Sequence, residues 1–252
     1  MASQELKIDK IKQEGTTYAE YEIYPFDRGF GHTFSAPLRR ILLSSIKGVS
    51  IVSLKIKGVD HEFSTMKGVK EDVLTFIVNL SKVVFQVEAS ESETVSLKVH
   101  GKKIVTASDI KVPGNVTVGN PEEYIAELTD DKSQLEVEIK IEAGYGFELA
   151  ENEIRNSETG LIPVNKNFSP VNKVNVNVRQ TRVGQKTDFE KIVMQIWTKG
   201  NVEPDEALKQ ASKIFTERLR DLDAVIHDFE GDLASERDKE EEYETSEEEE
   251  VK

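Results

Sequence analysis

The sequence predicts an α+β fold with mainly antiparallel sheet, in which a domain built from both chain ends carries an inserted, mainly β domain. Three observations support this. Strand patterns of period two dominate the 252 residues, and only three segments have helical periodicity. The two kinds of pattern do not alternate as βαβ units. The outer helical segments and the strands nearest to them come from the two ends of the chain, so we expect the strand-rich middle to be an insertion.

The first helical segment covers residues 34–46, where apolar residues recur every three or four positions. Thr33 is available as an N-cap. Pro37 is comfortable only in a first turn, so we expect the helix either to begin close to Ala36 or to be distorted at its start.

Two adjacent arginines, Arg39 and Arg40, lie on this first helix. Successive helical residues are about 100° apart, so at least one guanidinium should lie at the margin of the apolar face. There it can bind a carboxylate or backbone carbonyl groups of another chain. A solvated or intramolecular arginine pair is the alternative interpretation.

The other two helical segments are 69–80 and a longer one from Pro204 to about Ile226. Pro204 suits the first helical position, and Asp205 and Glu206 suit the positive end of the helix dipole. The apolar residues of the longer segment form a stripe with nearly heptad spacing. Such a stripe usually packs on its own sheet, and the alternative is that part of it contacts a second copy of the chain.

The remaining apolar runs alternate with polar residues, as in half-buried strands, and Gly, Asp and Asn separate them. The predicted strands are 18–24, 49–56, 83–87, 95–99, 135–143, 174–178 and 189–197.

The charge is unevenly distributed along the chain. Lys and Arg number 33 against 47 Asp and Glu, a net charge of −14, which excludes a non-specific nucleic-acid coat. Residues 228–252 carry 13 acidic and 3 basic residues, a net charge of −10. This segment repels itself and has little apolar surface, so we expect a disordered tail or the start of a linker, with the folded unit ending near His227.

No motif in the sequence indicates an active site. The chain has no cysteine, which excludes disulfides, thiolate zinc sites and cysteine nucleophiles. Its four histidines are isolated in sequence, so no metal site is expected. The Gly-x-Gly pieces at 29–31 and 144–146 lack a Walker lysine and predict turns. No apolar run is long enough for a membrane span, and we expect a cytoplasmic protein.

Four blocks resemble a known family. RGFGHTFSAPLRRILLSS at 28–45 resembles the signature RGFGHTLGNALRRILLSS of the alpha subunits of bacterial-type DNA-directed RNA polymerase. The blocks 59–80, 167–200 and 202–215 resemble the same family in the same order.

The resemblance implies a non-catalytic role. Alpha subunits of this family form a homodimer on which the β and then the β′ subunit assemble, with omega and sigma in the same complex. Nucleotidyl transfer uses aspartates and magnesium held by β′, so no catalytic residue and no cofactor is expected in this chain. The implied location is the cytoplasm of a bacterium or a plastid. The implied domains are a dimerisation domain (1–47 plus 171–227), an inserted domain contacting the large subunits (48–170) and the acidic tail (228–252).

Individual site residues also follow from the resemblance. It places the dimer contact on the two outer helices, at Phe34, Leu38, Ile41, Leu42, Leu208, Ala211, Phe215, Leu219 and Leu222. It places the large-subunit contacts at Arg39, Arg40, His61, Glu62, Phe63, Ser64, Thr65, Gly68, Val69, Arg179 and Arg182.

The chain departs from the family pattern in two respects. Ser35-Ala36-Pro37 replaces the usual Gly-Asn-Ala, which puts the start of the first helix in question. The family's small DNA-contacting domain normally follows a linker, and here an acidic run stands at that position, so we expect no direct DNA contact. Two other functions stay open: a free-standing dimeric interaction module with the same fold, and a carboxylate-based hydrolase, which no motif supports.

Overall fold

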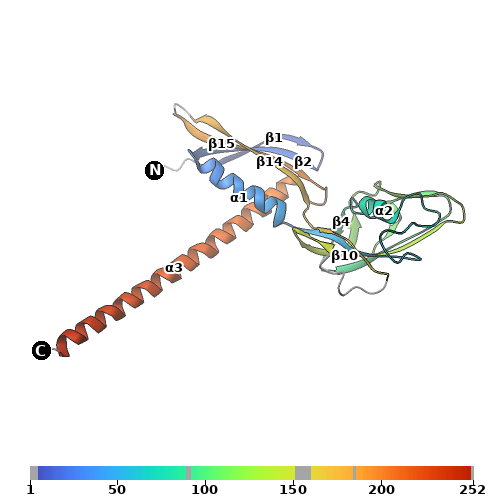
Figure 1. Ribbon diagram of the computed structural model, residues 1–252. Helices are drawn as coiled ribbons and strands as arrows, with labels where there is room; N and C mark the ends of the chain where they lie inside the picture. Colours follow the sequence, from blue (N-terminus) through green and yellow to red (C-terminus); the bar gives the residue numbers. More distant parts are fainter. Residues whose placement is uncertain (1–4, 89–91, 151–159, 184–185, 251–252) are drawn as a thin grey trace. The chain divides into compact units, whose positions relative to one another are not determined.

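A computed structural model describes residues 5–88, 92–150, 160–183 and 186–250 (Figure 1). The chain up to Ala211 forms one compact unit, and the residues from Ser212 on form a second. All sheet pairings among the described residues are antiparallel. The predicted α+β class is therefore confirmed, whereas the exact domain boundaries stay predictions.

One sheet combines the two ends of the chain. Its order is β1-β2-β15-β14, with β1 at Lys7–Glu14, β2 at Tyr18–Asp27, β14 at Val171–Val183 and β15 at Lys186–Thr198. Strand β1 was not predicted, because its eight residues are all exposed and so lack the one-sided burial that produces a period of two.

Helix α1 (Phe30–Ser44) packs on this sheet and begins earlier than predicted. Its N-cap is Gly29, in the left-handed conformation with φ 89°, and the predicted cap Thr33 lies inside the helix. The backbone N–H of Gly31 donates to Glu190 Oε2 at 3.0 Å, so β15 supports the first turn. Pro37 therefore lies in the helix interior, where its nitrogen cannot donate the usual hydrogen bond.

The middle of the chain forms a second, five-stranded sheet of order β12-β3-β10-β5-β7. The strands are β3 (Lys47–Ile56), β5 (Ser92–His100), β7 (Ile110–Lys111), β10 (Gln134–Tyr145) and β12 (Ile162–Pro163). Two-stranded ladders join β4 (Phe85–Val87) to β8 (Val116–Val118), β6 (Lys103–Thr106) to β9 (Tyr124–Leu128), and β11 (Phe147–Glu148) to β13 (Lys166–Asn167), and η1 (Ala107–Asp109) is a 3₁₀ turn.

Helix α2 (Val73–Leu80) is shorter than the predicted 69–80. Asp72 caps it by accepting a hydrogen bond from the backbone N–H of Thr75 at 2.8 Å. Hydrogen bonding to the side chain and the backbone of Thr75 holds the pKa of Asp72 below its usual range. Val69 instead forms a β-bridge with Leu128. Pairing with β9 therefore replaces the first helical turn that periodicity predicted.

Helix α3 (Pro204–Glu250) begins at the predicted proline but continues far beyond the predicted end near Ile226. Residues 228–250 are thus helical where the charge pattern predicted a disordered tail. Glu, Lys, Arg, Ala and Leu have high helix propensity, and a count of net charge does not register this local preference. Ion pairs such as Lys213 to Glu217, four residues apart, also favour the helix.

Two separate apolar cores organise these elements. One lies in the middle of the chain and encloses residues such as Phe76, Leu97 and Ile139 completely. The other lies between the four-stranded sheet, α1 and the start of α3, and includes Leu42 and Met194.

Candidate functional site

The two predicted arginines lie on the surface of α1. The side chains of Arg39 and Arg40 are both exposed, whereas Leu42 on the same helix is completely buried. Among the described residues, no hydrogen bond or ion pair involves either guanidinium. The structure therefore presents two positive charges that are available to another molecule.

These arginines border an open groove of about 520 Å³. One wall is α1, with His32, Ser35, Ala36, Arg39, Arg40 and Leu43, and the other is β14, with Val176, Asn177 and Val178. Val176 and Val178 are half-buried, so the floor is partly apolar and the rim is cationic. The sequence analysis identified the arginines but not the β14 wall, which lies more than 130 residues further along the chain.

The predicted contact residues at 61–69 form an exposed turn before α2. Phe63 is 75 % exposed, which is unusual for a large apolar side chain. The backbone N–H of Ser64 donates to the carbonyl of His61 at 3.2 Å, and the Ser64 hydroxyl lies 3.1 Å from Nδ1 of the same histidine. Glu62 is half-buried and Thr65 is exposed. Because Phe63 is presented to solvent without cover from its own chain, this turn suits a protein contact.

The far end of this segment is fixed by close packing. Gly68 has φ 77°, and a Cβ added there would lie 2.2 Å from Ser133 Oγ. Only glycine fits without displacing a neighbour. Val69 follows and pairs with Leu128, so both residues position the exposed turn.

A cluster of carboxylates and their partners supports the same segment. Glu71 accepts hydrogen bonds from the backbone N–H of Glu127 at 2.9 Å and from the Tyr124 hydroxyl. Burial and the Glu71 contact raise the pKa of Tyr124 to about 12. Lys70 donates to Glu127 at 2.7 Å and lowers the pKa of that carboxyl. These groups are held in internal pairs, so their role is to fix the segment.

The remaining predicted contacts lie on β14. Arg179 and Arg182 are both exposed. They belong to the hairpin β14–β15, which continues the strand that borders the α1 groove. The structure thus places all four predicted contact arginines on α1 and β14, and the 61–69 turn forms a separate group.

The predicted dimer residues of α1 mostly contribute to the core of their own chain. Leu42 is completely enclosed, and Phe34, Leu38 and Ile41 are half-buried against that core. Phe34 stacks near Phe26, with ring centroids 5.6 Å apart. Only the solvent-exposed parts of Phe34, Leu38 and Ile41 remain available to a second copy.

The predicted dimer residues of α3 divide along the helix. Leu208 and Ala211 are buried in the core, so a second copy cannot reach them. Phe215 is half-buried, and Leu219 and Leu222 are 47 % and 55 % exposed.

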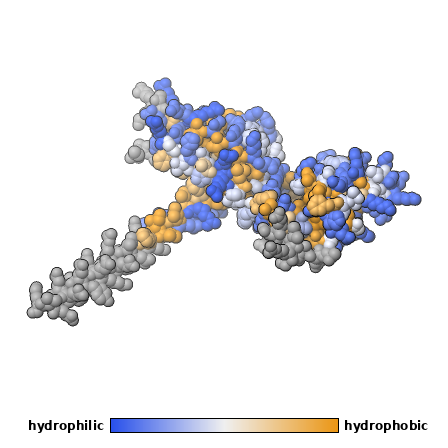
Figure 2. All heavy atoms as spheres, viewed as in Figure 1, coloured by the Kyte–Doolittle hydropathy of each residue, from blue (hydrophilic) through white to orange (hydrophobic). Residues whose placement is uncertain are grey.

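The exposed stripe extends beyond the predicted residues. Val225, Ile226 and Phe229 are also exposed, and Figure 2 shows apolar surface along this part of α3. A row of large apolar side chains on one helix is typical of a surface that a partner covers. The spacing in the sequence already indicated Ile226, whereas Val225 and Phe229 became apparent only from their exposure.

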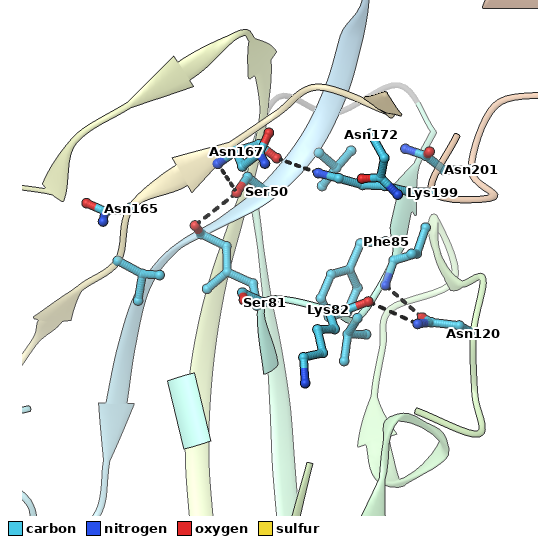
Figure 3. Close-up of a pocket in the computed structure, with 15 residues that line it drawn as sticks. Ser50, Ser81, Lys82, Phe85, Asn120, Asn165, Asn167, Asn172, Lys199 and Asn201 are labelled. Atoms are coloured by element: carbon cyan, nitrogen blue, oxygen red, sulfur yellow. Dashed lines mark hydrogen bonds between the residues drawn. The ribbon is translucent and has the colours of Figure 1, made fainter. Parts of the chain in front are cut away.

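A pocket of about 400 Å³ in the described part of the chain is rich in amide side chains (Figure 3). Lys199 donates to the carbonyl of Asn167 at 3.0 Å, and burial lowers the pKa of its ammonium group. The Ser50 hydroxyl accepts from the backbone N–H of Asn167 at 3.0 Å. No Asp, Glu or His is among the described residues that line the pocket, and Lys82 and Lys199 are its titratable groups.

Two further properties concern metals and membranes. Within the ranges that the structure describes, no three His, Asp or Glu side chains are grouped so as to hold a metal ion. In that same part of the chain, no helix is both long enough and apolar enough to cross a membrane.

Comparison with known proteins identifies the family. Residues 52–169 match the model of the RNA polymerase Rpb3/RpoA insert domain. The chain is 40 % identical over 245 residues to the DNA-directed RNA polymerase subunit alpha of Alkaliphilus metalliredigens (strain QYMF). The aligned region covers 96 % of this chain and 77 % of that protein. The chain belongs to the family of RNA polymerase alpha subunits.

Other alpha subunits agree. That of Lawsonia intracellularis (strain PHE/MN1-00) is 42 % identical over 216 residues, covering 85 % of this chain and 62 % of the relative. The alpha subunit of Heliobacterium modesticaldum (strain ATCC 51547 / Ice1) is 40 % identical over 223 residues, covering 85 % of this chain and 70 % of the relative. The chain thus spans between about three fifths and three quarters of the length of these alpha subunits, and the family resemblance in the sequence is confirmed.

Proposed function

We propose that this chain is an assembly scaffold of DNA-directed RNA polymerase. It forms a homodimer through the half-buried face of α1 and the exposed stripe of α3, and the dimer binds the β and β′ subunits in the cytoplasm. Omega and sigma join the same complex. The chain itself supplies no catalytic residue and no cofactor, and the catalytic magnesium belongs to β′.

The observation that carries the proposal is the pair of unpaired guanidinium groups of Arg39 and Arg40 beside an open groove. Exposed arginines at the edge of a partly apolar groove favour recognition of carboxylates on a protein partner. The exposed side chain of Phe63 provides a second surface on which a protein partner can pack, and this one is apolar. The exposed stripe on α3 supports self-association, because large obligate interfaces are apolar.

The large-subunit contact is tested by co-purification. The tagged Arg40→Ala chain, co-expressed with the β subunit of its own organism, is expected to remain dimeric and to lose β. Arg220→Ala, an exposed arginine on α3, is the matched control and should retain β. Normal retention of β by Arg40→Ala would refute the role of this arginine.

The dimer contact is tested by sedimentation. Phe215→Asp and Leu219→Asp together should give a monomer, because two buried charges in an apolar interface are costly to desolvate. An unchanged sedimentation coefficient would show that the stripe does not join two copies. A dimer that forms normally but never binds β or β′ would favour the free-standing interaction module.

A further inference from the structure

The four-stranded sheet has two edge strands, and they differ in how well they are protected. A bulge between Lys10 and Lys12 interrupts the edge strand β1, which is rich in lysine. Charges and bulges of this kind prevent other strands from pairing with an edge. The other edge strand, β14, pairs with β15 in an unbroken register from Lys173 to Thr181. It is therefore the open edge of the sheet.

The register shows which backbone groups this edge presents. The backbone N–H of Thr198 on β15 donates to the carbonyl of Thr17, which directly precedes β2. Backbone groups alternate in direction along a strand, so those of Gln195 and Val193 on β15 point toward β14. Their partners on β14 are Asn175 and Asn177, which therefore point back toward β15.

It follows that the N–H and C=O groups of Val174, Val176 and Val178 point outward, where no strand of the described chain pairs with them. The side chains of these valines lie on the face that packs toward α1, since Val174 is buried and the other two are half-buried against the same core. A strand added at this edge would thus find an apolar face and a row of backbone donors and acceptors.

The α1 groove lies over this same stretch of β14. Val176 and Val178 form one wall, and Arg39 and Arg40 belong to the other. We infer that β14 accepts an extended segment of another polypeptide as a fifth strand, and that carboxylates of this segment bind Arg39 and Arg40. The inference rests on the proposed function, and it assigns the segment to a large polymerase subunit.

Charge favours a different chain over a second copy as the occupant. If two β14 strands paired symmetrically about Val176, Lys173 of each would lie opposite Arg179 of the other. Like charges directly opposite each other destabilise a strand pair. The guanidinium groups of Arg39 and Arg40 would add further positive charge, whereas an acidic segment would neutralise it.

The inference is tested by removing one outward donor. Val176→Pro deletes an N–H that the β14–β15 ladder does not use, and proline is tolerated at such edge positions. Retention of the large subunit by the full chain should fall at least about tenfold, because the ring also blocks a neighbouring strand. Val176→Thr keeps the N–H and should lose less of the subunit than Val176→Pro, and an equal loss from both would show that the outward N–H is not what the partner uses.

A second control places the same change on the other edge. Ile8 occupies an outward-facing position of β1, since its neighbours Lys7 and Asp9 pair with β2 residues that point toward β1. Ile8→Pro should therefore leave retention within about twofold. Equal loss from both proline variants would overturn the inference, because it would reflect general damage to the sheet.

Hydrogen exchange on the unmodified chain tests strand addition to β14 even if Val176→Pro fails to fold. Binding of the large subunit should slow exchange at the amides of Val174, Val176 and Val178 by about tenfold or more. If the unmodified chain binds the subunit and Arg40→Ala loses it, but the three amides of the bound, unmodified chain exchange at an unchanged rate, strand addition is wrong and the scaffold function stands. If the unmodified chain binds no large subunit, the proposed function itself fails. Protection that depends on the concentration of this chain alone would identify a second copy as the occupant.

Discussion

The strand-rich middle of the chain and the four-stranded sheet bury their apolar residues to different extents. In the middle, Phe76, Leu80 and Leu128 are completely enclosed by their own chain. On the sheet, α1 leaves Phe34, Leu38 and Ile41 half-buried, and the α3 stripe that follows is exposed. The middle thus closes a core of its own and exposes Phe63 outside that core, whereas α1 leaves apolar side chains half-buried and α3 carries an exposed apolar stripe that another protein can cover. A division of this kind suits a scaffold, which must fold before its partners arrive.

The largest expected effect is in the enclosed core. Phe76→Ala removes a completely buried aromatic ring and should lower the free energy of unfolding by about 3–5 kcal/mol. Val78 lies on the same helix and is 57 % exposed, so Val78→Ala should change that free energy by less than about 0.5 kcal/mol. Urea denaturation of the two variants measures the difference. A small effect of Phe76→Ala would mean that the middle region does not have the closed core described above.

A smaller effect is expected where α1 crosses the sheet. A Cβ added at Gly31 would lie 2.7 Å from Val178 Cγ1 and 2.8 Å from Glu190 Oε2. Gly31→Ala should therefore cost about 1–3 kcal/mol of unfolding free energy, since the side chains of Val178 and Glu190, or α1 itself, must shift. Gly114, which has no atom within 4 Å of an added Cβ, is the control, and Gly114→Ala should be nearly neutral. If the two alanine variants unfold at the same urea concentration, the close contact between α1 and the sheet is not required for stability.

Much of this arrangement follows from local sequence patterns. The alternation of valine and asparagine at 174–178 correctly predicts a strand with one buried face, and Pro204 correctly marks the start of α3. The start of α1 could not be predicted in this way, because it depends on a hydrogen bond between Gly31 and Glu190, residues 159 positions apart. Long-range contacts of this kind leave no periodic signal.

The candidate site shows the same limit of local patterns. Helix geometry and the family resemblance both indicated Arg39 and Arg40, but the valines that complete their groove come from a strand more than 130 residues away. The length of α3 was missed for a different reason. Net charge dominated the prediction for 228–252, whereas the helix depends on the propensity of each residue.

The smallest expected effect concerns charges on the surface of the middle sheet. Glu136 on β10 lies between Lys98 and Lys57, at 2.5 Å and 2.9 Å, and these ammonium groups lower its pKa from the ordinary 4.5 to about 2. A carboxyl whose pKa is lower in the folded than in the unfolded state stabilises the fold above the unfolded pKa. The stabilisation is therefore present above about pH 4.5 and is lost as the pH falls toward 2.

Glu136→Gln should thus unfold at a slightly lower urea concentration than the unmodified chain at pH 7, and the two midpoints should converge as the pH falls to about 2. Added salt should reduce the difference at pH 7, since both ion pairs are largely exposed. Lys140→Gln, which removes the neighbouring ion pair to Glu142 on the same strand, is the control for a general loss of charge. A difference between Glu136→Gln and the unmodified chain that persists unchanged at pH 2 would show that Glu136 acts through packing, because its charge is then neutralised in the unfolded chain and half neutralised in the folded one.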